Sequence, residues 1–349
     1  MRAGWRAHVL DLCADADTAH TARSLEQVGD LASGFDASCV SQCLAELYDH
    51  SVIDGLVPGT GFEARPDLLK RIAAGRTLYG NPPALVRQMK SPRHFFALLE
   101  RLGIPYPETV LSPPGQAGGW LVKRTGGAGG AHVRHYYAAD RHAPDDYFQR
   151  HVEGQGCSVV FLADGREART LGFNETWVAT PGFRYGGAVA LPAIDPELKA
   201  ALSEAVTRLV SATGLRGLNG LDFIVAGDGW YALELNPRPP ASFELHEHGE
   251  GLFAAHVAAC RGRLPSRDTV ARTLRGHALV YAEHDLRIQP RTAWPEWVSD
   301  RPCAGTAIAK GLPVCSVHAE AEDPATTRGL LSSRSSELRA LLGMQDDAG

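Results

Sequence analysis

The chain has 349 residues, of which 44% are hydrophobic, and a formal net charge of −5. This length can bury more than one core, and the acidic balance argues against a general nucleic-acid-binding protein, which would carry a basic face. No apolar run is long enough to cross a membrane, and the first residues lack the apolar segment of a signal peptide. The seven cysteines show no paired Cys-x-x-Cys spacing, which predicts reduced thiols in a cytoplasmic protein.

The N-terminal part of the chain predicts an α/β domain. Its expected elements are a strand at residues 8–12, a helix at 38–49, a strand at 51–57 and a loop at 58–63. Residues 1–5 resemble the end of a helix, so we expect the opening strand of such a domain to be missing. A doubly wound sheet that lacks an inner strand would expose unpaired backbone edges.

Lysine is rare in this chain, which uses arginine for nearly all of its basic residues. A compact ammonium contacts phosphate differently from a planar guanidinium, so each lysine is informative. Lys90 stands just before Ser91 and Pro92, which predict the start of a helix that ends near Gly103. Anions are favoured at such a helix start. An ordinary solvated lysine is an equally good interpretation of Lys90 alone.

A glycine-rich turn follows a second informative lysine. Residues 119–123 predict a strand that ends at Lys123, and residues 131–137 alternate like its hairpin partner. The turn between them contains Gly126, Gly127, Gly129 and Gly130. A flexible turn of this kind lets backbone N–H groups approach a phosphate closely. No helix follows, so this is neither of the common phosphate-binding glycine motifs, and a merely mobile turn is the alternative.

The next two strands predict a place for a nucleotide base. Residues 146–154 predict a strand that closes on a glycine, and residues 157–163 predict its partner. The edge of such a strand can pair its backbone with adenine, flanked by Gln149 and Arg150. Two ordinary sheet strands are the alternative.

The most informative pattern is a hairpin over residues 221–235. Asp222 lies in one apolar strand and Glu234 in the next, followed by Asn236 and Arg238. A buried carboxylate without a neutralising partner is very costly. The hard oxygens of two acids and an amide are ligands that Mg²⁺ prefers, and Mn²⁺ would suit them too. Surface acids on an ordinary hairpin are the alternative, although facing acids are unfavourable.

The register of this hairpin depends on its loop. A three-residue loop at 227–229, with Gly229 in the left-handed conformation, would pair Asp222 with Glu234 and place Asn236 on the same face. A two-residue loop would put the acids out of register.

The remaining segments give weaker indications. Glu175, Arg184 and Tyr185 fall in what we expect to be loops before a helix at 196–213. The acids and histidines from Glu244 to Glu250, which include His246, Glu247 and His248, are expected to line a pocket mouth, since a helix after Pro240 would spread them too widely for a second metal. A strand at 276–283, a helix at 325–342 and a frayed end at 345–349 complete the chain.

Together these motifs resemble the ordered set of the ATP-grasp superfamily, from Lys90 to Arg238. The resemblance implies an α/β and α+β fold in which ATP lies between two lobes, after an N-terminal Rossmann-like pre-ATP-grasp domain. The implied domains are residues 1–89, an ATP-grasp domain at 90–265 with lobes at about 108–180 and 181–265, and a C-terminal extension at 266–349.

The resemblance also implies roles for individual residues. Arg238 and Lys123 would be catalytic, and Glu175, Arg184 and Tyr185 would contact the substrate. Mg²⁺ would bind Asp222, Glu234 and Asn236. ATP would contact Lys90, Lys123, Gly126, Gly127, Gly129, Gly130, Gln149, Arg150, Val152 and Glu153. The acid that often binds ribose is not evident after Gly154, and Glu153 is the nearest substitute.

Members of this superfamily mostly phosphorylate a carboxylate, and an amine or thiol then attacks the acyl phosphate. The resemblance therefore implies an ADP-forming carboxylate–amine ligase that acts on small molecules, without a nucleic-acid or membrane partner and with a homodimer as one option. The chain is most similar to the branch that contains tyramine–glutamate ligase, which implies glutamate as a substrate in one-carbon cofactor biosynthesis. A kinase of a non-carboxylate acceptor and a non-catalytic nucleotide-binding module are the alternatives.

Overall fold

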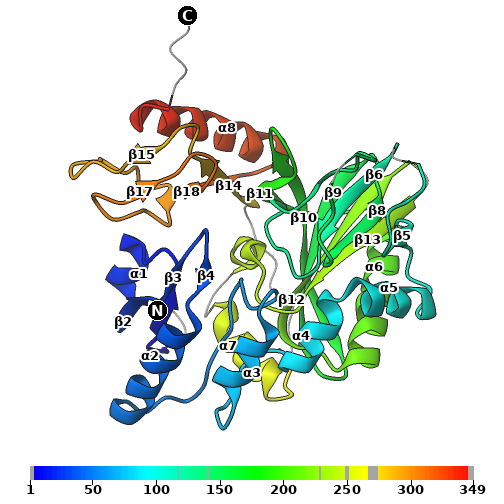
Figure 1. Ribbon diagram of the computed structural model, residues 1–349, viewed down its shortest axis with the longest axis horizontal. Helices are drawn as coiled ribbons and strands as arrows, with labels where there is room; N and C mark the ends of the chain where they lie inside the picture. The colour runs from blue at the N-terminus through cyan, green and yellow to red at the C-terminus, as the bar shows by residue number, and fades with distance from the viewer. Residues whose placement is uncertain are drawn as a thin grey trace, which may run out of the picture. The chain divides into compact units, whose positions relative to one another are not determined.

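The computed structural model describes residues 4–116, 118–139, 141–227, 229–247, 251–265 and 274–344. The chain forms two compact units, both of mixed helices and strands (Figure 1). Unit 1 combines Met1–Ile53, Gly186–Val189 and Arg272–Gly349, and unit 2 combines Asp54–Tyr185 and Ala190–Ala271. The boundaries expected near residues 89 and 265 stay predictions.

The N-terminal part of unit 1 is an α/β arrangement, as the sequence predicts. Strands β1 (His8–Asp11) and β2 (Ser24–Gln27) pair in parallel through helix α1 (Ala16–Thr21). A small hairpin of β3 (Gly29–Asp30) and β4 (Gly34–Phe35) precedes helix α2 (Ala37–His50). The expected helical end at the start of the chain is wrong for Gly4 and Trp5, which are not helical, while residues 1–3 lie outside the described residues.

The C-terminal part of unit 1 is an antiparallel sheet covered by a helix. Strand β14 (Leu274–Tyr281) pairs with β18 (Pro313–Ala321), which also pairs with β16 (Val298–Ser299). Residues 187–189 of β11 (Arg184–Leu191) pair with β14. Strands β15 (Leu286–Arg287) and β17 (Ala307–Ile308) form a separate pair, and α8 (Pro324–Leu341) packs on β14 and β18. The predicted late strand and helix are confirmed, and residues 345–349 lie outside the described residues.

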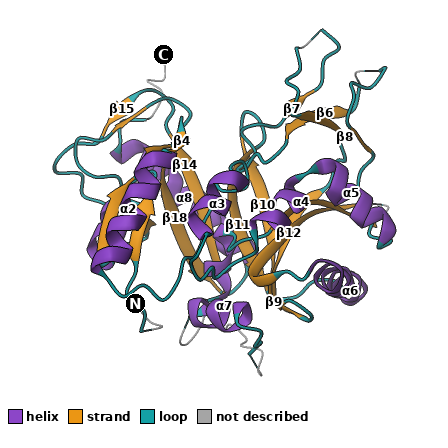
Figure 2. Ribbon diagram, turned by 60° about the horizontal axis from the view of Figure 1, so that its bottom comes forward, coloured by secondary structure: helices purple, strands orange, loops and turns teal. Residues whose placement is uncertain are grey.

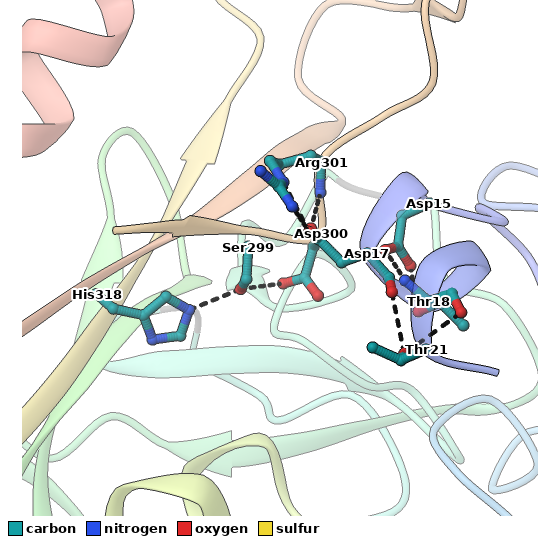
Figure 3. Close-up of polar contacts among 8 residues, drawn as sticks. All are labelled: Asp15, Asp17, Thr18, Thr21, Ser299, Asp300, Arg301 and His318. Carbon is teal, nitrogen blue, oxygen red and sulfur yellow. Dashed lines mark hydrogen bonds and ion pairs between the residues drawn. The ribbon is translucent and has the colours of Figure 1, made fainter. Parts of the chain in front are cut away.

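An ion pair joins the two ends of unit 1 (Figure 3). Arg301 donates from its backbone N at 2.9 Å and from Nε at 2.6 Å to the Asp17 carboxylate on α1. Next to it, the Ser299 hydroxyl lies 2.6 Å from Nε2 of His318 and 3.5 Å from the Asp300 carboxylate. The hydroxyl is in the middle of this group, whereas a hydrolytic triad has the imidazole in the middle. The cluster therefore ties β16 to its surroundings.

Unit 2 contains two antiparallel sheets. The smaller has the order β5-β8-β6-β7, and the other runs β13-β12-β9-β10 within this unit. Their strands are β5 (Thr109–Val110), β6 (Trp120–Arg124), β7 (Arg134–His135), β8 (Asp146–Arg150), β9 (Gln155–Asp164), β10 (Ala168–Ala179), β12 (Arg216–Ala226) and β13 (Gly229–Asn236). The expected pairing of β8 with β9 is wrong, because β9 is an inner strand that pairs with β10 and β12 instead.

Helices cover both faces of the larger sheet of unit 2. The helical elements are α3 (Pro66–Ala73), α4 (Pro83–Lys90), α5 (Pro92–Arg101), α6 (Pro196–Thr213), the 3-10 helix η1 (Ala241–His246) and α7 (Leu252–Cys260). Helix α6 begins and ends where the sequence predicts, after the N-cap Asp195. On one face, Val159 and Phe161 of β9 pack in a core with Leu209 of α6. Val160 and Leu162 belong to a core on the other face, with Leu252 and Ala259 of α7. Figure 2 shows α6 and α7 on either side of β9.

Two segments of unit 2 differ from their predicted structure. Residues 51–57 form no strand, and Leu56 makes only an isolated bridge with Leu78. Pro58, two residues after Leu56, has no backbone N–H and so cannot donate a hydrogen bond to a neighbouring strand. The expected loops around Glu175 and Arg184 are instead parts of β10 and β11. Backbone pairing with β9 holds β10 as a strand despite its polar residues.

Membrane-spanning helices are not found among the described residues, since none combines the needed length with enough apolar character.

Replacing Arg301 by Met should destabilise the protein by roughly 1 kcal/mol, because the ion pair with Asp17 is only partly shielded from water. Burial alone would raise the pKa of Asp17, but hydrogen bonds from Arg301 outweigh it and lower that pKa. The stabilisation is therefore present above the unfolded-state pKa of about 4 and is lost as pH falls through the lower folded value. Urea unfolding of R301M, D17N and the double variant at pH 7 and pH 3 measures this coupling. Equal coupling at both pH values would contradict it.

Candidate functional site

Two acids face each other across the β12–β13 hairpin. Asp222 lies opposite Glu234, as predicted, and Gly220 lies opposite Asn236. The expected three-residue loop is wrong, because Ala226 pairs with Gly229; residue 228 lies outside the described residues. A β-bulge next to Asp222 leaves one extra residue in β13 and restores the register that a two-residue loop would have broken.

The ammonium of Lys90 lies among the side chains of this hairpin. Its Nζ donates to Oε1 of Glu234 at 2.5 Å and to Oδ1 of Asn236 at 2.9 Å. Asn236 in turn donates from Nδ2 to Asp222 at 2.9 Å. Lys90 ends α4, immediately before the N-cap Ser91 of α5, and its side chain is 4% exposed compared with 34% for Glu234. Lys90 is thus a buried cation rather than a solvated surface lysine.

The surroundings shift the pKa values of the two acids in opposite directions. Burial and the nearby Glu234 raise the pKa of Asp222 to about 6. Burial alone would also raise the pKa of Glu234, but the charge and hydrogen bond of Lys90 outweigh it and lower that pKa. Glu234 therefore carries the more firmly held negative charge of the pair. Two carboxylates and an amide oxygen that lie together, two of them in contact with the Lys90 ammonium, form a donor set that suits Mg²⁺.

Lys123 is held by a buried amide in the smaller sheet. Its Nζ donates to Oε1 of Gln149 at 2.6 Å, and Gln149 is 1% exposed. Burial lowers the pKa of Lys123, while Glu234 and Asp222 oppose that effect. Because side chains alternate along a strand, Arg150 points to the other face of this sheet. There its guanidinium lies 4.8 Å from the ring centroid of Trp120, away from Lys123.

The glycine-rich turn, residues 126–130, is fixed at both ends rather than free. A Cβ on Gly126 would lie 3.0 Å from the Glu63 carbonyl oxygen, and one on Gly130 would lie 1.9 Å from the Phe183 carbonyl oxygen. Tyr185 N donates to the Gly129 carbonyl at 2.9 Å. The turn therefore packs tightly against two other backbone segments, which only glycine permits.

The other predicted contact residues take different positions. Arg184 starts β11 next to this turn, so its backbone and that of Tyr185 are close to the glycines. Glu175 pairs with Cys157, on the sheet face opposite the one that carries Asn174 and Asp222. Val152 and Glu153 lie in the connection between β8 and β9, with Glu153 exposed.

Arg238 has a partner that the sequence did not reveal. Its Nε donates to Oε1 of Glu63, and these side chains are 12% and 2% exposed. The other carboxylate oxygen of Glu63 accepts from Gly61 N at 2.8 Å. Burial would raise the pKa of Glu63, but Arg238 and Lys90 outweigh it and lower that pKa. Glu63 ends the glycine-containing loop at 58–63, but it lies 175 residues from Arg238, so no sequence spacing could link them.

A buried asparagine holds the backbone next to Arg238. Asn81 donates from Nδ2 to the Pro237 carbonyl at 2.9 Å and to Oδ1 of Asn219 at 2.8 Å. Its Oδ1 accepts from Arg216 N at 2.8 Å. Asn81 stands just before α4, so one side chain links the helix that carries Lys90 to the strand end that carries Arg238.

A pocket is lined by Lys90 and Glu234 and by Gly126 and Gly127 of the glycine-rich turn. Sequence reasoning missed His132, which also lines it. A Cβ on Gly127 would lie 2.4 Å from the His132 ring, so the imidazole rests directly on the glycine turn. Burial lowers the pKa of His132. Its position directly after the glycines was the available signal.

The histidines and acids after Pro240 do not form a second metal centre within the described residues, where no group of three or more His, Cys, Asp or Glu is arranged for one. His246 pairs from Nε2 with Oδ1 of Asn174 at 2.8 Å, and Glu247 accepts from Leu252 N at 3.1 Å. His248 and Glu250 lie outside the described residues.

Parts of the chain are similar to two proteins of known sequence. The chain is 28% identical over 240 residues to the carbamoyl phosphate synthase large chain of Thermus thermophilus, which covers 61% of this chain and 23% of that protein. It is 34% identical over 91 residues to tyramine–L-glutamate ligase of Methanocaldococcus jannaschii, which covers 26% of this chain and 28% of that protein. The chain thus spans about a quarter of the length of these relatives.

A solved structure has the same fold. The biotin carboxylase domain dimer of Hydrogenobacter thermophilus 2-oxoglutarate carboxylase, in complex with MgADP, ADP and bicarbonate, matches with a TM-score of 0.72 and 13% identity, over 93% of this chain and 83% of that one. Residues 91–242 match the family of ATP-grasp domains. The resemblance found in the sequence is therefore confirmed at the level of the fold: the structure has the ATP-grasp fold, and residues 91–242 match the ATP-grasp domain family.

Proposed function

We propose that this protein is an ATP-dependent, ADP-forming ligase that joins a carboxylate to an amine. The observation that carries the proposal is a connected group of side chains: Glu234 and Asn236 contact a buried ammonium, and Asn236 holds Asp222 beside them. The match of residues 91–242 to ATP-grasp domains and the shared fold with a biotin carboxylase domain in complex with MgADP support it.

The nucleotide phosphates are assigned to the pocket between Lys90, Glu234 and the glycine-rich turn. Lys90 and Lys123 would neutralise phosphate charge, and the backbone N–H groups of the turn would donate to phosphate oxygens. The base is assigned to the connection after β8, near Val152 and Glu153. Gln149 then has the role of holding Lys123 in place rather than contacting the base.

Asp222, Glu234 and Asn236 would hold Mg²⁺. When bound, the ion supplies charge neutralisation on the phosphoryl group that is transferred. The carboxylates would hold it through their ionised oxygens, and the Asn236 amide orients Asp222 through the hydrogen bond described above.

The proposed reaction has two steps. A substrate carboxylate oxygen bonds to the γ-phosphorus of ATP while the bond to the ADP oxygen breaks, which gives an acyl phosphate and ADP. An amine then attacks the acyl carbon, and inorganic phosphate leaves as the amine loses a proton. Arg238 can stabilise the acyl phosphate through its guanidinium fork, and the buried carboxylate of Glu63 fixes the orientation of that fork.

Glutamate is the acid that we propose, supported by the similarity to tyramine–L-glutamate ligase. A homodimer is the proposed assembly, supported by the domain dimer of the structural neighbour. The substrate and the homodimer are assigned by similarity alone, and neither assignment depends on the arrangement of Asp222, Glu234 and Lys90.

The ligase proposal predicts that phosphate release from ATP depends on both an acid and an amine. A coupled phosphate assay with glutamate among a panel of acids and amines should show turnover only when both are present. With an acid alone, hydroxylamine should trap the acyl phosphate as a hydroxamate. Phosphate release that is indifferent to the amine would contradict the ligase, and a stable phosphorylated product without an amine would indicate a kinase.

Replacing Glu234 by Gln should lower turnover at least about 100-fold, because a side chain that would bind the metal ion directly loses its negative charge. The measurement is hydroxamate formation at saturating Mg²⁺ and ATP. Turnover within about twofold of the wild type would contradict the assignment of Glu234 as a metal ligand.

Replacing Glu63 by Gln should lower kcat by about 10–100-fold, because the Arg238 guanidinium loses its fixed orientation. The KM for ATP should stay within about twofold, since the phosphate-binding lysines are unchanged. Asp67→Asn is the matched control, because Asp67 also pairs with an arginine but is 83% exposed. A fall in kcat of equal size in both variants would show that the burial of Glu63 has no special role.

A further inference from the structure

The ammonium of Lys90 lies where a metal ion would bind. Its Nζ contacts Glu234 Oε1 at 2.5 Å and Asn236 Oδ1 at 2.9 Å, and these are two of the three groups assigned to Mg²⁺. An ammonium and a divalent cation cannot both lie within contact distance of the same oxygens without strong repulsion. The described conformation is therefore one in which Lys90 and a metal ion exclude each other.

Charge balance explains why the lysine is there. Asp222 and Glu234 are close together, and the larger part of the Lys90 side chain is buried. Unpaired carboxylates in such surroundings are very costly. Lys90 neutralises Glu234 directly, so the hairpin can fold before any metal ion is present.

We propose that Lys90 is a resident counter-ion for the metal ligands, which is exchanged for the divalent cation when the nucleotide binds. This inference rests on the proposed function, since it takes Asp222, Glu234 and Asn236 as the metal ligands. The phosphates offer the displaced ammonium a new set of negative oxygens. Lys90 thus serves two partners in turn, the carboxylates first and the phosphates second.

The surroundings are consistent with this movement. The pocket assigned to the phosphates is lined by both Lys90 and Glu234, so the ammonium and the phosphate site border the same space. The flexible four-carbon stem of lysine can carry the charge while the backbone stays fixed. The backbone is anchored nearby, because Asn81 at the start of α4 is held by three hydrogen bonds.

The exchange couples metal binding to nucleotide binding. Metal alone must displace Lys90 into a pocket without phosphates, so it binds weakly. A nucleotide that carries its metal ion supplies a partner for the lysine at the same moment. The two ligands therefore favour each other through one side chain.

Lys123 provides a matched comparison in the same pocket region. It is also a lysine near the acids, although only partly buried, and its Nζ donates to the Gln149 amide at 2.6 Å. Its removal leaves the oxygens of Glu234 and Asn236 occupied by Lys90. Loss of Lys123 should therefore weaken nucleotide binding without opening the metal site.

The test measures how tightly the full-length wild type and its variants bind Mn²⁺ in the absence of nucleotide. Binding is monitored through the electron paramagnetic resonance signal of free Mn²⁺. Lys90→Met should bind Mn²⁺ at least about tenfold more tightly than the wild type, because the competing charge is gone. The same variant should bind MgADP more weakly. Lys123→Met should weaken MgADP binding but leave Mn²⁺ affinity within about twofold, and Lys90→Arg, which keeps the charge, should bind Mn²⁺ as weakly as the wild type.

The outcomes separate the inference from the function. If K90M binds Mn²⁺ no more tightly than the wild type while the wild type binds MgADP, the exchange is wrong and the proposed function stands. If the wild type binds neither MgADP nor Mn²⁺, the proposed function fails as well. If K90M and Lys90→Gln unfold without metal, refolding on addition of Mn²⁺ supports the exchange, because the ion then replaces the lost charge. Failure to refold with Mn²⁺ overturns it.

Discussion

Two carboxylates that face each other across one hairpin are the constraint on which the rest of unit 2 depends. Asp222 and Glu234 lie opposite each other next to a hydrophobic core, where like charges repel strongly. Lys90, from a helix more than a hundred residues earlier, neutralises Glu234, and the amide of Asn236 donates a hydrogen bond to Asp222. Folding of the hairpin and placement of α4 are therefore parts of the same electrostatic arrangement.

Buried polar contacts extend this arrangement to the other parts of the site. Asn81 holds the backbone beside Arg238, and Glu63 holds its side chain. The segment that carries Glu63 also packs against Gly126 of the glycine-rich turn. The groups that would stabilise charge during phosphoryl transfer are thus fixed in advance, and preorganised charges of this kind are the main source of catalysis in such reactions.

A second long-range contact organises unit 1. Helix α1 and the segment at Arg301 lie at opposite ends of the sequence, and the pair of Asp17 with Arg301 joins them. Residues of the first and last segments belong to one compact unit. Each unit is completed by ionic contacts between distant segments, in addition to its hydrophobic core.

The sequence by itself determined the locally encoded features. Helix α6, with its Asp195 N-cap and regular apolar spacing, was predictable to the residue. The pairing of Asp222 with Glu234 was also predicted, but from a three-residue loop that the structure does not have. The ordered motifs from Lys90 to Arg238 were sufficient for the ATP-grasp fold. These features depend on neighbours within a few residues, or on motifs whose order is itself written in the chain.

Only the tertiary structure decided the long-range features. It showed the bulge that restores the register of Asp222, the inner position of β9, and the partner Glu63 of Arg238. It also turned Arg150 away from Lys123 and placed His132 at the pocket. A bulge, a strand order or an ion pair across 175 residues depends on which surfaces pack together, and that packing is settled by the whole chain at once rather than by any local pattern.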